Sequence, residues 1–254
     1  MITTYIRPQN LADALKALAL PNTIPLAGGT FINTPAFGIS CDISVVDLQA
    51  LGLGTIEKSG DSLEIGATTT LQALLEEPEI LPALKKAVSQ EATVNIRNSA
   101  TIAGTLVVAD GRSPLAVVML AIDAKLTLAD MKTQEAKYYG ELLPILSEAI
   151  SGKLILKIGL PLKVKLAWEQ VSRTPADKPI ISVALARWPS GRVRLALGGF
   201  GSMPILGLDG VDETGVIAAA RNAMHDADDD WGSAEYRSEM AAVLAQRCLQ
   251  ELVE

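Results

Sequence analysis

The chain has 254 residues, of which 49% are hydrophobic, and a formal net charge of -7 at pH 7. This length and apolar content suffice for a sizeable core in one large domain or two modest ones, whereas the acidic balance argues against a nucleic-acid partner. The longest apolar run, Leu115 to Ile122, covers eight residues, and a membrane span needs about 20. Because the stretch MITTYIRPQN lacks the charged-then-apolar order of a signal peptide, we expect a cytoplasmic protein with no membrane partner.

Cysteine and histidine are scarce. Cys41 and Cys248 lie far apart in sequence, and His225 is the single histidine. This scarcity excludes a four-cysteine cluster and multi-histidine metal sites, and it disfavours a Ser-His-Asp triad. We therefore expect no metal site and no catalytic side chain here. Either the chain does no acid–base chemistry, or a cofactor supplies the chemistry.

The first fifty residues predict a β-α-β-like unit. Asn10 suits the N-cap of a helix from Leu11, and Pro21 ends that helix. A short strand then runs into the glycine pair at 28–29, and the short β-branched run at 43–48 predicts a buried strand. This unit ends near residues 51–54.

The next hundred residues are less regular. Strands are predicted at 62–70, 124–129 and 153–161, and helices from about 71, over 83–91, from Ser113 and at 140–150. Pro78 and Pro82 break the first of these helices. The segment 95–114 is rich in small and β-branched residues and reads as neither a clean helix nor a clean strand.

After residue 162 the pattern changes. Runs at 163–174, 180–188 and 192–201 predict an antiparallel sheet with a hairpin turn at 189–191, and helices follow at 212–226 and from Ser233 onward. We therefore predict an α+β fold with a boundary near residue 162. Its parts are 1–162, with subdomains of about 1–54 and 55–162, and then 163–254.

The stretch Pro25 to Thr34, PLAGGTFINT, follows a predicted strand as a phosphate loop does. It is neither G-x-G-x-x-G nor a loop ending in G-K-[ST], so the Rossmann and Walker A interpretations fail. Gly28 and Gly29 permit φ > 0, which allows their N–H groups to converge on an anion, and Thr30 adds a hydroxyl. An ordinary turn remains the alternative.

A second segment of small residues, NSATIAGTLVVADGRSP, carries Gly104 between Thr101 and Thr105. Small side chains allow a backbone to approach a ligand closely, and threonines supply donors without charge. One hypothesis is that the two segments bind a diphosphate from two sides. The other is that their small residues only allow two strands to pack closely against a helix. Spacing alone does not separate these hypotheses.

Four motifs give the chain a family resemblance. AGGT at 27–30 and IRNSATIAGTL at 96–106 resemble the two flavin loops of the FAD-binding subunit of the molybdenum hydroxylases. LALGGFGSMPI and SAEYRSEMAAVLAQRCL resemble motifs of its C-terminal domain. This family includes the medium chains of bacterial xanthine dehydrogenase and carbon monoxide dehydrogenase, and the resemblance spans nearly the whole chain.

The resemblance implies a two-subdomain FAD-binding domain of the vanillyl-alcohol-oxidase type, followed by a small antiparallel sheet with helices. It implies FAD as cofactor and an electron path from [2Fe-2S] clusters on a partner chain, fed by a molybdopterin large subunit, to NAD or another acceptor. The residues it implies for FAD are Leu26, Ala27, Gly28, Gly29, Thr30, Phe31, Ile32, Asn33, Thr101, Ala103, Gly104, Thr105, Asp110 and Ile155.

The second motif departs from the family pattern. Ala100, Ala103 and Thr105 replace two glycines and an asparagine, and Pro114 occupies the place of an aspartate. Glu169 stands where many members carry a lysine. These changes favour a second hypothesis, a relative that binds FAD weakly or not at all and acts as a scaffold. A third is a flavin oxidoreductase of the same fold that acts alone.

Overall fold

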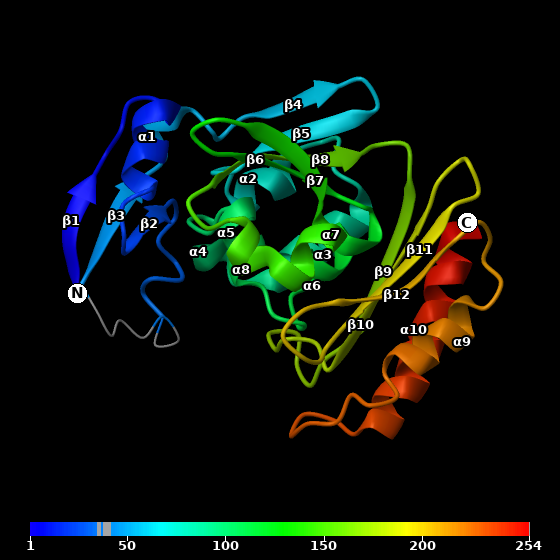
Figure 1. The fold of residues 1–254 in the computed structure, drawn as a ribbon. Coiled ribbons are helices and arrows are strands. Elements are labelled where there is room, and N and C mark those ends of the chain that lie inside the picture. Colours follow the sequence, from blue (N-terminus) through cyan, green and yellow to red (C-terminus); the bar gives the residue numbers. More distant parts are fainter. Residues whose placement is uncertain (35–36, 38–41, 254) are drawn as a thin grey trace. The chain divides into compact units, whose positions relative to one another are not determined.

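The computed structural model describes residues 1–34, 37 and 42–253 (Figure 1). Its contacts define two compact units. The first comprises Met1–Glu76, Val94–Val108 and Lys125–Leu160, and the second comprises Glu77–Thr93, Ala109–Ala124 and Pro161–Glu254. Both units contain helices and strands, which confirms the expected mixture of α and β structure. The two-subdomain arrangement and the boundary near 162 stay predictions.

The N-terminal part of the first unit is a three-stranded parallel sheet with one helix. Its strands are β1 (Ile2–Ile6), β2 (Thr23–Leu26) and β3 (Ile43–Asp47), in the order β1-β3-β2. The helix α1 (Leu11–Leu18) is capped by the Asn10 side chain, which accepts from the Asp13 N–H at 2.9 Å. The one-turn helix η2 (Gln49–Leu51) follows. The predicted helix and the two predicted strands after it are confirmed, whereas the strand before the helix, β1, was not predicted because it is largely exposed and lacks a strong apolar pattern.

The rest of the first unit is built on a five-stranded sheet with the order β4-β5-β8-β6-β7. The strands are β4 (Ile56–Ser59), β5 (Ser62–Gly66), β6 (Lys125–Ala129), β7 (Gln134–Tyr138) and β8 (Leu154–Pro161). The edge strands β4 and β7 were not predicted because most of their residues are polar and exposed. The strand expected over 62–70 ends at Gly66.

Short helices accompany this sheet. They are α2 (Leu71–Glu76), α4 (Val94–Arg97), α5 (Ile102–Val108), α7 (Tyr139–Leu142), η3 (Leu143–Ile145) and α8 (Leu146–Ala149). The helix expected at 140–150 is split into three pieces around Pro144, which lacks a backbone N–H. The segment 95–114 is mainly helical, and Thr101 caps the first turn of α5: its Oγ1 accepts from the Gly104 N–H at 3.3 Å, and its carbonyl accepts from Thr105 N at 2.9 Å.

The second unit centres on an antiparallel sheet with the order β12-β11-β10-β9. Its strands are β9 (Lys165–Val171), β10 (Ile181–Arg187), β11 (Val193–Gly198) and β12 (Ile205–Gly210). The apolar face packs on α9 (Val216–Ala223) and α10 (Ala234–Val253), whose first turn is capped by Ser233. Cys248 is buried in this core, where desolvation raises the pKa of its thiol. Cys41 lies outside the described residues.

Two further helices complete this unit, α3 (Pro82–Glu91) and α6 (Pro114–Ala121). Every residue of α6 is buried, and a Cβ on Gly198 would meet Val117 at 2.4 Å. Gly198 alternates with Leu197, which faces α9 and α10, so α6 covers the opposite face of the sheet. Burial on both faces explains why β10 is apolar apart from Ser182 and the terminal Arg187.

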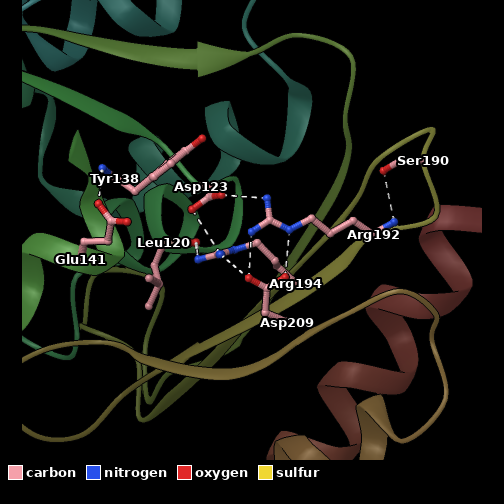
Figure 2. A network of polar contacts seen from close by, with 8 residues as sticks. All are labelled: Leu120, Asp123, Tyr138, Glu141, Ser190, Arg192, Arg194 and Asp209. Atoms are coloured by element: carbon pink, nitrogen blue, oxygen red, sulfur yellow. Dashed lines mark hydrogen bonds and ion pairs between the residues drawn. The ribbon is translucent and has the colours of Figure 1, made fainter. Parts of the chain in front are cut away.

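An ion network joins the end of α6 to this sheet. Figure 2 shows Arg192 and Arg194 converging on Asp123 and Asp209. Arg194 is only 4% exposed, and its Nη2 also donates to the Leu120 carbonyl at 3.1 Å. The network therefore satisfies a carbonyl at the helix C-terminus and both terminal nitrogens of a buried guanidinium, whereas Arg194 Nε has no hydrogen-bond partner among the described residues.

Among the described residues, no helix has both the length and the apolar character that a membrane crossing requires.

Candidate functional site

The first unit encloses a cavity of about 460 Å³, a size typical of small-molecule sites. It lies where the loop after β2 meets α5 and the start of β8. Most of its walls are apolar side chains and backbone. The lining residues are Leu18, Thr23–Ile32, Phe37, Leu48, Ala67, Thr101, Ala103, Gly104, Val107, Val108, Ser147 and Ile150–Ile155.

The loop after β2 offers unused hydrogen-bond donors to this cavity. Among the described residues, no protein acceptor takes the backbone N–H groups of Gly28, Gly29, Thr30 and Phe31. Gly29 has φ = 68°, a conformation that glycine adopts without strain. The Asn33 side chain donates to the Gly29 carbonyl at 3.0 Å and so braces the loop. Because unpaired backbone N–H groups are costly unless a ligand or water takes them, this loop suits an anion.

Gly28 holds the loop against the second segment. A Cβ placed on Gly28 would lie 1.7 Å from the Ser99 carbonyl oxygen and 3.3 Å from Ala100 N. No other residue type fits without displacing the backbone. The two segments singled out in the sequence are therefore in direct contact.

The second segment contributes differently from the first. The Ile102 N–H donates to Thr69 O at 2.9 Å and the Ala103 N–H to Ala67 O at 3.3 Å, and those of Gly104 and Thr105 bond to Thr101. These four groups are thus not available to a ligand. The Thr101 hydroxyl accepts from Gly104 and retains its own proton for donation. This segment supplies close-fitting walls and one hydroxyl rather than a second set of free N–H groups.

Most of the predicted cofactor residues meet in this cavity. Leu26 to Ile32, Thr101, Ala103, Gly104 and Ile155 all line it. Asn33 and Thr105 are not among the lining residues. The Asn33 side chain donates to the Gly29 carbonyl of the loop, and the Thr105 hydroxyl donates to Thr101 O at 2.9 Å. Asp110 belongs to the second unit, where it accepts from Lys178 Nζ and from the Arg112 N–H. The assignment of these residues to a cofactor stays a prediction.

The alanines that replace family glycines impose no backbone strain. The non-glycine residues with positive φ in the described chain are Asn22 and Asp123, so Ala100 and Ala103 have ordinary negative φ. Ala100 is 5% exposed, and its carbonyl accepts from Leu71 N at 2.9 Å. An added methyl is therefore compatible with the backbone at both positions.

Pro114 takes a structural place in the second unit. It opens α6, where its missing N–H costs nothing, and Ser113 Oγ caps the helix by accepting from Ala116 N at 3.1 Å. Glu91 Oε2 accepts from Ser113 Oγ and Leu115 N, both at 2.9 Å. Burial raises the pKa of Glu91. The carboxyl group at the N-terminus of α6 is thus supplied by Glu91 on α3 rather than by a residue at position 114.

Glu169 is also paired within the second unit. Its carboxylate forms an ion pair with Lys86, whose Nζ donates to Trp168 O at 3.2 Å as well. The negative charge at this departure from the family pattern is therefore balanced by a neighbouring cation.

Sequence reasoning missed one wall of the cavity. Ser147 and the segment from Ile150 to Leu154 line it, and Lys153 is the one charged residue among its described lining residues. Gly152, with φ = 66°, forms the turn before β8, and a glycine at this place is a signal that could have drawn attention to this wall. A second overlooked signal lies in α5, where Val107 and Val108 are 36% and 42% exposed, as expected for apolar side chains that face a ligand site.

Comparison with known proteins gives a family match over residues 1–163, to the FAD binding domain in molybdopterin dehydrogenase. The glyceraldehyde dehydrogenase medium chain of Sulfolobus acidocaldarius is 26% identical to the chain, and the alignment covers 98% of each. The 6-hydroxypseudooxynicotine dehydrogenase complex subunit alpha of Paenarthrobacter nicotinovorans is 30% identical, over 96% of this chain and 92% of that protein.

Solved structures share the fold. A chain of quinoline 2-oxidoreductase from Pseudomonas putida 86 superposes with a TM-score of 0.84 at 22% identity, covering 100% of this chain and 98% of that one. At this identity the likeness speaks for the architecture alone.

Proposed function

This chain belongs to the family of FAD-binding domains of molybdopterin dehydrogenases, and we propose that it carries electrons through FAD as the medium subunit of a molybdenum hydroxylase complex. FAD is the cofactor that the family implies. The observation that carries the proposal within this chain is the loop of Gly28 to Phe31: its residues line a cavity of suitable size, and no acceptor in the described part of the chain takes its four backbone N–H groups.

The residues present fit a dinucleotide diphosphate. An anion with several oxygens satisfies the open N–H groups at once, and no carboxylate belongs to the described lining residues. A Cβ at Gly28 would fill the space that allows the loop to close on the second segment. In this proposal the Gly28–Phe31 backbone and the Thr101 hydroxyl bind the phosphates, while Val107, Val108 and Ile155 pack on apolar parts of the ligand and exclude water.

Bound FAD would supply the exchange between one-electron and two-electron carriers, a chemistry that no side chain provides. The protein's own part is to hold the cofactor and set its surroundings. The scarcity of histidine and cysteine agrees with this division of labour. The organic substrate is then oxidised elsewhere in the complex.

The partners follow from the same proposal. One relative is named as a subunit of a dehydrogenase complex and another as a medium chain. We propose that an iron–sulfur subunit with [2Fe-2S] clusters and a molybdopterin large subunit deliver electrons to this chain, and that NAD or another acceptor removes them.

The scaffold hypothesis rested on the eroded second motif. Ala100 and Ala103 have negative φ, and their own N–H groups donate to Ile96 O and Ala67 O within the protein. The replacements therefore leave the donors of the first loop untouched, which favours retention of FAD over a purely structural role.

The proposal is tested by purifying the chain and titrating it with FAD. A yellow protein, or saturable uptake of FAD by the colourless one, supports the proposal. A folded protein that ignores FAD favours the scaffold. Co-purification with an iron–sulfur chain and a molybdenum chain separates the proposed role from that of a flavin oxidoreductase acting alone.

A further inference from the structure

Lys153 is the feature of the cavity that the family motifs leave unassigned. It directly precedes β8 and lies two residues before Ile155, which also lines the cavity. Residues two apart on an extended segment project to the same side. The single cation among the described lining residues thus shares a wall with a residue already placed at the ligand.

The strand pairing brings Lys153 to one acidic partner. Leu128 on β6 pairs with Ile155 on β8 and with Glu135 on β7, so these three positions form one row across the sheet. Lys153 Nζ donates to Glu135 Oε1 at 2.8 Å. The lysine side chain is 26% exposed and the glutamate 36%, so solvent reaches both members of the ion pair.

Glu135 is shared between two lysines. Its other oxygen, Oε2, lies 3.3 Å from Lys137 Nζ. The nearby Asp130 uses its carboxylate to accept from Lys132 N, Thr133 N and Thr133 Oγ1. Lys137 can therefore neutralise Glu135 alone, and Lys153 is free to exchange its partner without leaving an unpaired carboxylate.

We propose that Lys153 is a phosphate-anchoring residue of the cavity, which leaves Glu135 and pairs with a phosphate group of a bound nucleotide. This inference rests on the proposed function, since FAD is the nucleotide expected there. Neutral N–H groups position the phosphates, whereas a mobile ammonium group adds the counter-charge that they lack.

If Lys153 pairs with a phosphate, its removal should weaken the binding of ligands that carry phosphate and should not affect the binding of the flavin ring alone. Replacing Lys153 by Met keeps the aliphatic stem and removes the charge. We expect the Kd for FAD and for ADP to rise about tenfold, while the weaker binding of riboflavin, which has no phosphate, stays within about twofold.

Two variants separate this role from a structural one. Lys137→Met removes the other lysine on Glu135, at a position that does not line the cavity. Glu135 then holds Lys153 more firmly, so the Kd for ADP should rise, but by less than in Lys153→Met because both members of the ion pair are solvent-accessible. Glu135→Gln breaks the ion pair but frees Lys153, and should leave the Kd for ADP unchanged or lower it. The alternative is that Lys153 only stabilises the sheet through its ion pair with Glu135. In that case Glu135→Gln and Lys153→Met weaken ADP binding equally.

The experiment uses the full chain and measures each Kd by calorimetry, with circular dichroism to show that every variant is folded. If Lys153→Met does not fold, Lys153→Gln takes its place, and the salt dependence of ADP binding to the parent adds a second readout. A Kd for ADP unchanged in the charge-removing variant overturns the inference while the parent still binds FAD. A parent that binds neither FAD nor ADP overturns the proposed function along with it.

Discussion

Gly28 and Ser99 touch across the two glycine-rich segments, with room for a hydrogen but not for a methyl group between them: a Cβ on Gly28 would sit 1.7 Å from the Ser99 carbonyl oxygen. This contact connects the loop that carries the free N–H groups to the helical segment that forms the opposite wall. The shape of the cavity therefore depends on a residue that contributes no side chain.

Gly28→Ala should disrupt this junction. The added methyl forces the loop away from Ser99, and overpacking of this kind costs about 1–3 kcal/mol of the free energy of unfolding. We expect a lower urea midpoint together with weaker FAD binding. Gly54→Ala is the matched control, since its Cβ would meet Thr68 Oγ1 at an ordinary 3.5 Å. Equal stability of the two variants would contradict the role given to Gly28.

Gly29→Asp places a carboxylate beside the open N–H groups. Juxtaposed like charges cost several kcal/mol, so we expect FAD retention to fall by about 100-fold or more. Gly29→Asn carries the same backbone strain at φ = 68° without the charge. The difference in Kd between the two variants measures the electrostatic part. Indistinguishable Kd values would place the phosphates elsewhere.

Ala103→Gly restores a glycine that the family carries. Because φ at this position is negative and the Ala103 N–H already bonds to Ala67 O, glycine brings no new donor and loosens α5. We expect a loss of about 0.5–1 kcal/mol in the free energy of unfolding and a Kd for FAD within about twofold of the parent. A tenfold gain in affinity would show that the methyl group obstructs the ligand.

Acid should weaken the second unit through Asp209. Hydrogen bonds from Arg192 and the charge of Arg194 hold the pKa of Asp209 below its ordinary value. A depressed folded-state pKa gives stability that is present above pH 4 or so and is lost as pH falls through that pKa.

Asp209→Asn should therefore lower the free energy of unfolding at pH 7 by about 1 kcal/mol after solvent screening, measured as a lower urea midpoint, and flatten the dependence of that midpoint on pH below about 4. Glu57→Gln, at an exposed position on β4, serves as the control. A parent-like pH profile in Asp209→Asn would show that the network of Figure 2 does not set acid stability.

The sequence predicted much of this arrangement where local signals are strong. Some features depend only on residues close together in sequence, and these form as predicted. They are the Asn10 and Ser233 caps, the turn at the glycine pair and the hairpin at 189–191. Eleven of the fourteen residues assigned to FAD line one cavity. The mixed α and β content follows from the same local patterns.

What could not be predicted depends on distant contacts. The edge strands β1, β4 and β7 are largely exposed and form because neighbouring strands pair with them. The segment 95–114 is mainly helical because Thr101 caps α5 while the Thr69 and Ala67 carbonyls, distant in sequence, accept the first N–H groups of the helix. Lys153 reaches the cavity through the pairing of β8 with β6, which nothing near residue 153 encodes.

The central claim is that this chain holds FAD in the cavity between the Gly28–Phe31 loop and α5, and FAD titration of the purified full chain tests it most directly. Flavin fluorescence and the visible spectrum are followed for the parent and for Gly29→Asp side by side. The account predicts saturable one-to-one binding by the parent and its loss in the variant. A folded parent that leaves the flavin spectrum unchanged, or a variant that binds as well as the parent, would contradict it.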